Sequence, residues 1–114
     1  AIEGITPGWK DAPLPGVFRN LTIENNTINR SDNSGIFMTG TDTAVIRGNT
    51  IRGVCDKPTQ ERCTAVIHIE SSRNITLENN QAEQSRQGAG CQAVLRLAEN
   101  NELDTIILKG NAGF

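Results

Sequence analysis

The sequence predicts an all-β fold of the solenoid type, in which short strands stack as successive coils. Three observations lead to this prediction. A strand-and-bend motif recurs along the chain, a second apolar strand lies between successive copies, and one outward position alternates in charge from copy to copy. Such internal repeats are typical of solenoids, in which each coil packs only against its neighbours.

The first copy of the motif is NLTIENNTI, at residues 20–28. Leu21 and Ile23 alternate with polar residues, which is the pattern of a half-buried strand. Two asparagines, Asn25 and Asn26, follow at the point where the strand ends. Because Asn is the non-glycine residue that best accepts a left-handed backbone conformation, the pair predicts a sharp bend.

The same motif recurs in three later segments. These are AVIRGNTI at 44–51, ITLENNQA at 75–82 and IILKGNAG at 106–113. Aligned without gaps, the copies share one asparagine column, preceded in each copy by Asn or Gly, the residue types that accept positive φ. The column is Asn26, Asn49, Asn80 and Asn111, and the preceding residues are Asn25, Gly48, Asn79 and Gly110.

A second strand is predicted between successive copies of the motif. Its segments are GIFMTG at 35–40, VIHIES at 66–71 and VLRLAE at 94–99. The extra length of the later repeats falls mainly in polar segments such as residues 55–63. A solenoid tolerates insertions of this kind, because they leave one corner of an otherwise constant coil.

On these motifs, residues 17–111 resemble the right-handed parallel β-helix proteins, the fold of pectate lyases, polygalacturonases, alginate epimerases and phage tailspikes. The resemblance implies a single-stranded right-handed parallel β-helix of about four coils, with three short strands in each coil. It also implies that the asparagine column is an internal ladder, in which each side-chain amide bonds to its neighbours above and below.

The resemblance gives a simple division of the chain. Residues 17–114 are expected to form the coils, and residues 1–16 an irregular lead-in or end cap, or a truncated coil that begins with AIEGI. The chain starts at Ala1 without Met, so a processed or excised polypeptide is expected.

The outward charges support the proposed register. The position after the second apolar residue of the motif reads Glu24, Arg47, Glu78 and Lys109, so its sign alternates along the coils. Opposite charges on neighbouring strands stabilise the pairing by a few tenths to about 1 kcal/mol, and like charges oppose it.

Composition excludes several function classes. The net charge of −2 and the scattered arginines give no basic surface for nucleic acid, and no apolar run is long enough to span a membrane. With 36% hydrophobic and only 4% aromatic residues, the core is expected to consist mainly of aliphatic side chains.

The cysteines leave two pairings open. Cys63 and Cys91 occupy equivalent positions on adjacent coils, within reach of a disulfide, whereas Cys55 and Cys63 bracket the polar insertion CDKPTQERC. We favour Cys55 with Cys63, because a long polar insertion gains most from such a bond and Cys91 can remain a small buried residue. Oxidised cysteines indicate a secreted or periplasmic protein, and extracellular polysaccharide or oligosaccharide is the usual partner of the fold that the chain resembles.

The candidate site lies on the outward side of the second strand. His68, Arg96 and Glu70 are the predicted catalytic residues, because an Arg or His beside carboxylates can abstract the C5 proton of a uronate or position a glycosidic oxygen. The alternative is that His68 is simply an exposed strand residue packed beside Phe37 and Arg96. The predicted substrate-binding residues are Phe37, Asp56, Glu61 and Arg62. No dedicated metal site is predicted, although paired carboxylates here can hold Ca²⁺ or act as acid and base.

Two functions remain open. The first is a portion or small member of a carbohydrate-active β-helix protein, a lyase or glycoside hydrolase acting on an extracellular polysaccharide. The second is a non-catalytic β-helix module for glycan binding or oligomer assembly. The polygalacturonase, pectate lyase and epimerase motifs are absent, so no catalytic set is carried over from those families. A short stack has exposed ends, so association through the ends of the helix stack is expected.

Overall fold

The computed structural model describes residues 2–4, 16–31, 34–54, 65–83 and 93–114, which form three parallel sheets. Sheet A has the order β1 (Ile2–Gly4), β4 (Ile36–Thr39), β7 (Ala65–Glu70) and β10 (Ala93–Leu97). Sheet B has the order β2 (Phe18–Glu24), β5 (Thr41–Arg47), β8 (Arg73–Glu78) and β11 (Ile107–Lys109). Sheet C consists of β3 (Thr27–Asn29), β6 (Thr50–Arg52) and β9 (Gln81–Ala82).

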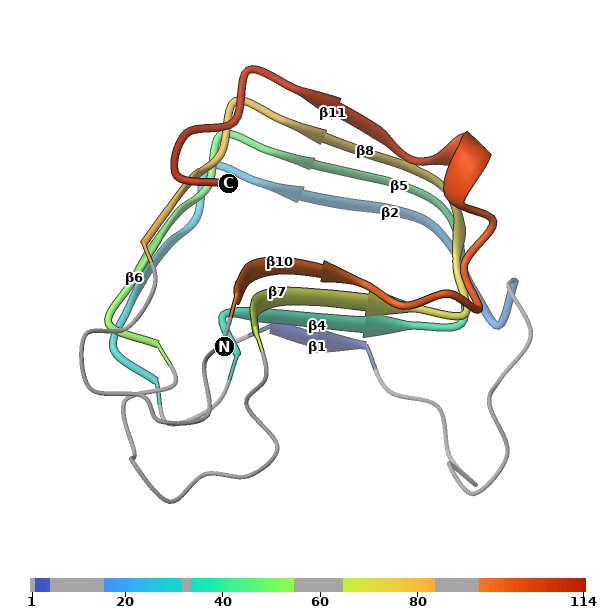
Figure 1. Cartoon of the computed structure of the whole chain (residues 1–114), viewed down its shortest axis with the longest axis horizontal. Coiled ribbons are helices and arrows are strands. Elements are labelled where there is room, and N and C mark those ends of the chain that lie inside the picture. The colour runs from blue at the N-terminus through green and yellow to red at the C-terminus, as the bar shows by residue number, and fades with distance from the viewer. Residues whose placement is uncertain (1, 5–15, 32–33, 55–64, 84–92) are drawn as a thin grey trace.

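Each coil visits the three sheets in turn. The chain runs from β4 in sheet A to β5 in sheet B and β6 in sheet C, and it returns to sheet A at β7 (Figure 1). All strand neighbours are parallel and belong to successive coils. A single 3₁₀ turn in the described ranges, η1 (Leu103–Thr105), precedes β11 in the last coil. The predicted fold, a right-handed parallel β-helix of about four coils, is therefore confirmed.

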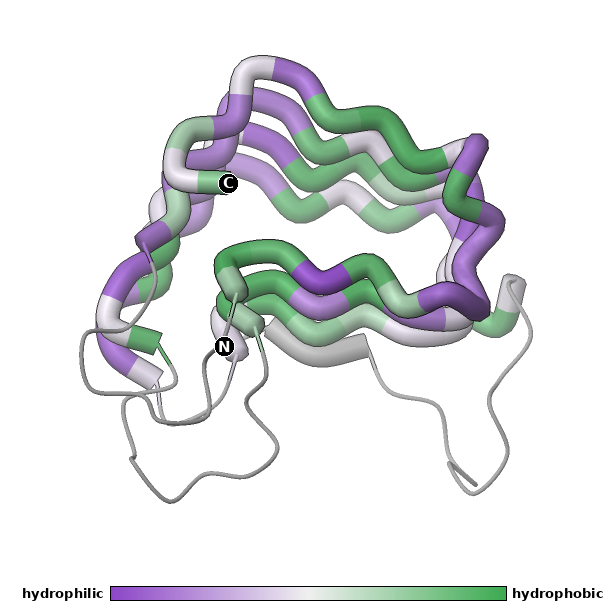
Figure 2. Tube along the Cα trace, viewed as in Figure 1, coloured by the Kyte–Doolittle hydropathy of each residue, from purple (hydrophilic) through white to green (hydrophobic). Residues whose placement is uncertain are grey.

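The predicted register is also confirmed. Ile36 pairs with Ile67 and Leu95 pairs with Ile67, so the second strands of the repeat align as the sequence indicates. Glu24, Arg47, Glu78 and Lys109 lie in one column across sheet B. Figure 2 shows that apolar and polar positions recur at the same place from coil to coil. The alternation within each strand turns the apolar residues toward the space between the sheets.

The core is aliphatic, as the composition predicts. It fills the space enclosed by the three sheets and, among the described residues, is built mainly from branched side chains, with Met38, Ala44 and Ala82 besides. Its largest fully buried side chains are Ile36, Met38, Ile46, Ile51, Ile67, Ile69, Ile75, Leu77, Val54 and Val66.

The asparagine ladder is the main polar feature of the interior. Asn49 and Asn80 are fully buried, at the corner between sheets B and C. The Oδ1 of Asn49 accepts from the backbone N–H and the side-chain amide of Asn26, at 3.0 and 3.1 Å. The Oδ1 of Asn80 accepts in the same way from Asn49, and that of Asn111 from Asn80. The predicted internal ladder is confirmed.

The residues before the ladder form the predicted bend. Asn25, Gly48, Asn79 and Gly110 have φ between 54° and 63°, in the left-handed region. A Cβ added at Gly48 would lie 2.6 Å from the Oδ1 of Asn25, and one at Gly110 would lie 2.6 Å from the Oδ1 of Asn79. The side chain of an asparagine in one coil therefore occupies the space beside the glycine of the next coil, which explains why Asn and Gly alternate in this column.

A second polar ladder lies at the corner between sheets A and B, where the sequence shows no repeated residue type. The backbone N–H of Thr41 donates to the Oγ of Ser72 at 3.2 Å, and the N–H of Ser72 donates to the Oδ1 of Asn101 at 2.9 Å. Asn101 in turn donates to the carbonyl of Ile69 at 2.8 Å. Two different side chains, those of Ser72 and Asn101, thus satisfy equivalent backbone N–H groups in successive coils.

Some sequence-based predictions lie outside the described residues. These are the Cys55–Cys63 disulfide and the alternative pairing with Cys91, and most of the proposed lead-in at residues 1–16. In the described part of that lead-in, β1 pairs in parallel with β4. No helix among the described residues has the length and apolar character needed to cross a membrane.

Candidate functional site

The outward side of sheet A carries the predicted site column. Phe37 on β4, His68 on β7 and Arg96 on β10 are in register, each one strand from the next. Adjacent strands are about 4.8 Å apart, so these three side chains lie side by side along the stack. The rings of Phe37 and His68 are in contact, with centroids 4.8 Å apart and planes tilted by 56°.

The strand alternation explains why His68 faces outward. Its neighbours Ile67 and Ile69 belong to the hydrophobic core and are fully buried. Residue 68 therefore points to the opposite face of β7. The outward position does not leave it open to water, because only 9% of His68 is exposed. Arg96, one coil further on, is exposed.

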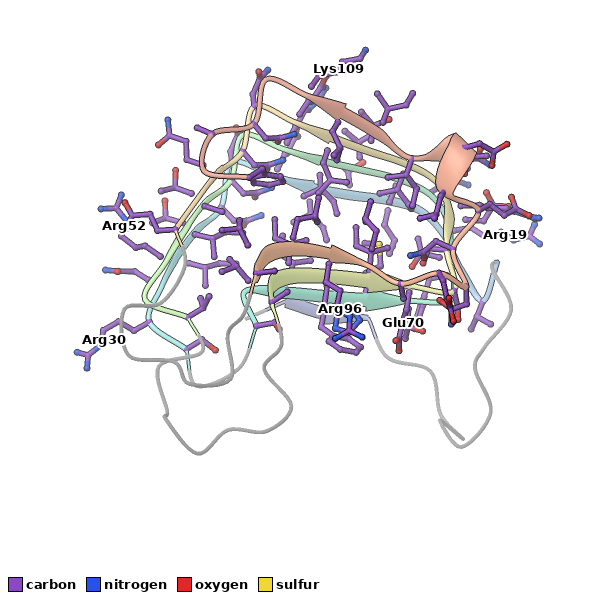
Figure 3. All side chains as sticks on the ribbon, viewed as in Figure 1. Arg19, Arg30, Arg52, Glu70, Arg96 and Lys109 are labelled. Carbon is purple, nitrogen blue, oxygen red and sulfur yellow. The ribbon has the colours of Figure 1, made fainter. Side chains whose placement is uncertain are left out.

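Glu70 lies on the same outward face, two residues beyond His68. Its Oε2 is 3.6 Å from the Nε2 of His68, which makes an ion pair only when the imidazole is protonated. Figure 3 shows Glu70 and Arg96 projecting from the same side of sheet A, away from the interior. The face thus presents an aromatic surface, a carboxylate and a guanidinium within neighbouring strands.

The surroundings of His68 favour its neutral form. Burial lowers the pKa of the imidazole below its ordinary value of 6.5, and the charge of Arg96 lowers it further, while the Glu70 carboxylate acts in the opposite direction. At neutral pH the ring is therefore uncharged and one of its nitrogens can accept a proton. General-base chemistry is open to such a group, although the small exposed fraction limits contact with a substrate.

The structure brings together four of the predicted site residues and describes no others. Phe37, His68, Glu70 and Arg96 share one face of sheet A. Asp56, Glu61 and Arg62, the remaining predicted binding residues, lie outside the described residues. Within the described ranges, no group of three His, Cys, Asp or Glu side chains is arranged to hold a metal ion, whether Ca²⁺ or another.

A second polar cluster, which the sequence analysis missed, lies on the outside of sheet B. Asp42 accepts hydrogen bonds from the Nε of Arg73 at 2.9 Å, from Asn74 at 3.0 Å and from Thr43 at 3.0 Å. The bond from Asn74 contributes most, ahead of Arg73 and Thr43, to lowering the pKa of the Asp42 carboxyl below 3.8. These bonds engage both carboxylate oxygens within the protein, so the cluster stabilises strand pairing. The sequence pattern that could have predicted this cluster is the alternation of charge along one outward column, at Arg19, Asp42 and Arg73.

The fold and its outward columns define the chain as a parallel β-helix protein. The particular family follows from comparison with known families: residues 16–107 match NosD, described as periplasmic copper-binding protein, and the chain belongs to this family. Searches among curated proteins and among solved structures found no significant match.

The family match bears on two sequence-based predictions. Its periplasmic description confirms the predicted secreted or periplasmic location. It also confirms the β-helix part of the resemblance, since NosD proteins share that fold. Activity on a polysaccharide is not part of the family's description and stays a prediction.

Proposed function

We propose that this periplasmic β-helix protein binds an acidic glycan along the outward face of sheet A. The observation that carries the proposal is the column of Phe37, His68 and Arg96, with ring contact at 4.8 Å and the cation one strand further along. An aromatic ring offers an apolar surface to the face of a sugar, and a guanidinium binds a carboxylate through charge-assisted hydrogen bonds. A uronate residue presents both features.

The stack geometry suits an extended ligand. Successive coils repeat about every 4.8 Å, so side chains of one column form a line along the stack axis. A polymer lying along this line can contact Phe37 and Arg96 at the same time. Glu70, beside this line, would repel a carboxylate placed over β7, which favours a carboxylate at the Arg96 end of the column.

A catalytic version of this proposal has one specific observation in its favour. The lowered pKa of His68 keeps the imidazole neutral at pH 7, as a general base requires, and Arg96 beside it can neutralise a uronate carboxylate, as a lyase-type proton abstraction requires. Against it stands the small exposed fraction of His68. We therefore favour binding without turnover, in keeping with the non-catalytic module that the sequence left open.

The copper named in the family's description does not fit the described residues. Copper sites use imidazole nitrogens and cysteine or methionine sulfurs in small groups. Among the described residues, His68 lies beside the Glu70 carboxylate, and Met38 is buried in the core. No metal-holding group is present in the ranges that the structure describes, so no step of the proposed function uses copper.

The test is a binding measurement with matched oligosaccharides. A uronate oligomer and a neutral oligomer of equal length are titrated against the wild-type chain and the Arg96→Gln and Phe37→Leu variants. Loss of one charge-assisted contact should weaken uronate binding roughly tenfold or more in Arg96→Gln. Phe37→Leu should weaken the binding of both oligomers, since the contact that the ring makes does not depend on the charge of the sugar.

The control is Arg52→Gln, which removes the same charge from the exposed side of sheet C. It should leave uronate affinity within about twofold, because charges far from a ligand contribute little at moderate salt. Equal affinity for the two oligomers, or equal affinity of Arg96→Gln and wild type, would contradict the proposal. Release of unsaturated or shortened products by the purified wild-type chain would replace it with the catalytic version.

A further inference from the structure

Two opposite charges on the outward side of sheet A lie on neighbouring strands without pairing. Arg96 of β10 is in register with His68 of β7, and Glu70 lies two residues further along β7. With a strand spacing of about 4.8 Å and a rise of about 3.3 Å per residue, the Cα atoms of Arg96 and Glu70 are about 8 Å apart along a diagonal. Figure 3 shows both side chains on the same outer side of the sheet.

Sheet B provides the contrast to this separation. There, opposite charges on neighbouring strands contact each other, as Arg47 does with Glu24 at 2.8 Å. Within the described part of the chain, Arg96 makes no ion pair, and the contact of Glu70 is with the Nε2 of His68 at 3.6 Å. Because that distance is longer than a hydrogen bond, both charged groups keep their hydrogen-bonding capacity for a ligand.

The surface between the two charges is formed by rings. His68 lies at the corner between Arg96 and Glu70, and its ring contacts that of Phe37 at 4.8 Å. Arg96 is exposed, and 33% of the Glu70 side chain is exposed. A sugar ring placed over this surface therefore has a cation at one edge and a carboxylate at the other.

A third polar group at this place, the hydroxyl of Thr39, is buried without a partner. Thr39 on β4 is in register with Glu70, and it faces outward because its neighbour Met38 belongs to the core. Only 3% of Thr39 is exposed, and its Oγ1 makes no hydrogen bond within the part of the chain that the structure describes. A buried hydroxyl without a partner is costly. A ligand hydroxyl held at Glu70 can supply that partner after a small rotation of either side chain.

From this arrangement we infer that Arg96 and Glu70 bind opposite edges of one uronate unit. The guanidinium binds the carboxylate of the sugar, and the Glu70 carboxylate accepts hydrogen bonds from neighbouring ring hydroxyl groups, beside Thr39. One pyranose ring with its substituents can bridge the diagonal separation of about 8 Å. The inference rests on the proposed function and adds a selectivity to it. The site takes uronates whose ring hydroxyl groups are free, in preference to uronates in which these groups are acetylated.

The inference also explains why a carboxylate lies in a site for an acidic ligand. A carboxylate that only bordered the site would repel the uronate. A carboxylate that accepts from the ring hydroxyl groups offsets this repulsion, and it holds the charged edge of the sugar next to Arg96. These two interpretations predict opposite effects on uronate affinity when the charge of Glu70 is removed.

The experiment titrates the whole chain with a uronate oligomer whose ring hydroxyl groups are free, and with the same oligomer after acetylation. Wild type should bind the acetylated oligomer roughly tenfold or more weakly, from the loss of hydrogen bonds to a charged acceptor. In Glu70→Gln, affinity for the free oligomer should fall roughly threefold to tenfold, because a neutral amide accepts hydrogen bonds more weakly. The preference between the two oligomers should narrow by a similar factor.

The controls separate hydrogen bonding from bulk and from general charge. Glutamate and glutamine are nearly equal in size, so a preference that came from the bulk of the acetyl groups would survive in Glu70→Gln. Glu78→Gln removes a carboxylate from the outside of sheet B and should leave both affinities within about twofold. Thr39→Val removes a buried hydroxyl and should weaken binding of the free oligomer about threefold without lowering the melting temperature of the chain alone. Circular dichroism identifies a variant that is not folded.

Failure of this inference differs from failure of the proposed function. The Arg96–Glu70 pair is overturned, while the binding face stands, if Arg96→Gln weakens uronate binding but wild type binds the two oligomers equally. An unchanged preference in Glu70→Gln, or tighter uronate binding by that variant, has the same consequence. If Arg96→Gln binds uronate as wild type does, the pair and the proposed function are both overturned. A lower melting temperature of Thr39→Val would show that its hydroxyl already has a partner, which removes Thr39 from the site.

Discussion

At the scale of single residues, the asparagine ladder combines two tasks in one side chain. Each buried amide satisfies a backbone N–H and a backbone carbonyl of the preceding coil, as Asn80 does with Asn49 and Ile46. Buried polar groups without such partners are costly. The ladder thus holds the coils in register while it satisfies the buried amides of Asn49 and Asn80 at this corner.

Replacement of a buried ladder residue should therefore be costly. In Asn49→Ala and Asn80→Ala, we expect the free energy of unfolding to fall by about 1 to 3 kcal/mol, because each removal strands a backbone N–H and the amide of a neighbouring asparagine. Urea titration followed by circular dichroism measures this loss. Asn29→Ala, at an exposed position of β3, is the matched control and should change stability by less than about 0.5 kcal/mol. Unchanged stability in both ladder variants would refute the ladder's contribution.

The backbone conformation of Thr43 is unfavourable for a β-branched side chain. Its φ is 71°, in the left-handed region, and it occupies the same column as Asn20 and Asn74, whose φ values are 55° and 56°. A β-branched residue is strained there, whereas asparagine accepts this conformation.

We expect Thr43→Asn to raise the free energy of unfolding by about 0.5 to 1 kcal/mol, from relief of that strain less the lost hydrogen bond from Thr43 to Asp42. Thr22→Asn, on the outward side of β2, tests whether asparagine stabilises these strands in general. It should be neutral or destabilising. Equal gains in the two variants would attribute the effect to the residue type and not to the left-handed backbone.

At the scale of elements, the outward side of sheet A makes stability depend on pH. Burial lowers the folded-state pKa of His68, so between that value and the unfolded value of 6.5 the unfolded chain binds more protons than the folded chain. The contribution of neutral His68 is fully present above pH 6.5 and is lost as the pH falls through the folded-state pKa.

The prediction is a steeper loss of stability below pH 6.5 in wild type than in His68→Gln, which has no proton to gain. Thermal melting from about pH 8 to about pH 5 gives the two curves. Their separation should be constant above about pH 7 and should shrink as the medium becomes more acidic. Parallel curves over the whole range would show that His68 does not titrate differently in the folded and unfolded states.

The elements also show why the sequence predicted so much of this fold. Strand pairing in a β-helix repeats the same position coil after coil, so the repeat alone aligns Asn26 with Asn49 and Glu24 with Arg47. The second polar ladder was missed because two different residue types, Ser72 and Asn101, accept from equivalent backbone N–H groups there. Burial of His68 was missed for a different reason. Alternation along β7 predicts the side of the sheet on which a residue lies, but not what else packs on that side.

The site is less predictable than the fold for the same physical reason. Phe37, His68 and Arg96 came together because register alone decides which residues share a column. Their chemical role depends on reach, burial and ligand geometry, none of which a repeat determines. Family membership adds the fold and the location, while the described residues do not supply the copper ligands that its description suggests.

At the scale of the whole molecule, a stack stabilises its inner coils more than its outer ones, because each coil packs only against its neighbours. Leu77 and Leu108 make this difference measurable, since they are adjacent in one column of sheet B. Leu77 is fully buried between two coils, whereas 48% of Leu108 is exposed at the last end. The residue type, the sheet and the facing direction are the same, so only the position in the stack differs.

We therefore expect Leu77→Ala to cost about 2 to 5 kcal/mol of unfolding free energy, as full burial implies, and Leu108→Ala to cost about 1 kcal/mol or less. Denaturant titration followed by circular dichroism gives both values. Equal costs in the two variants would contradict this dependence on position in the stack.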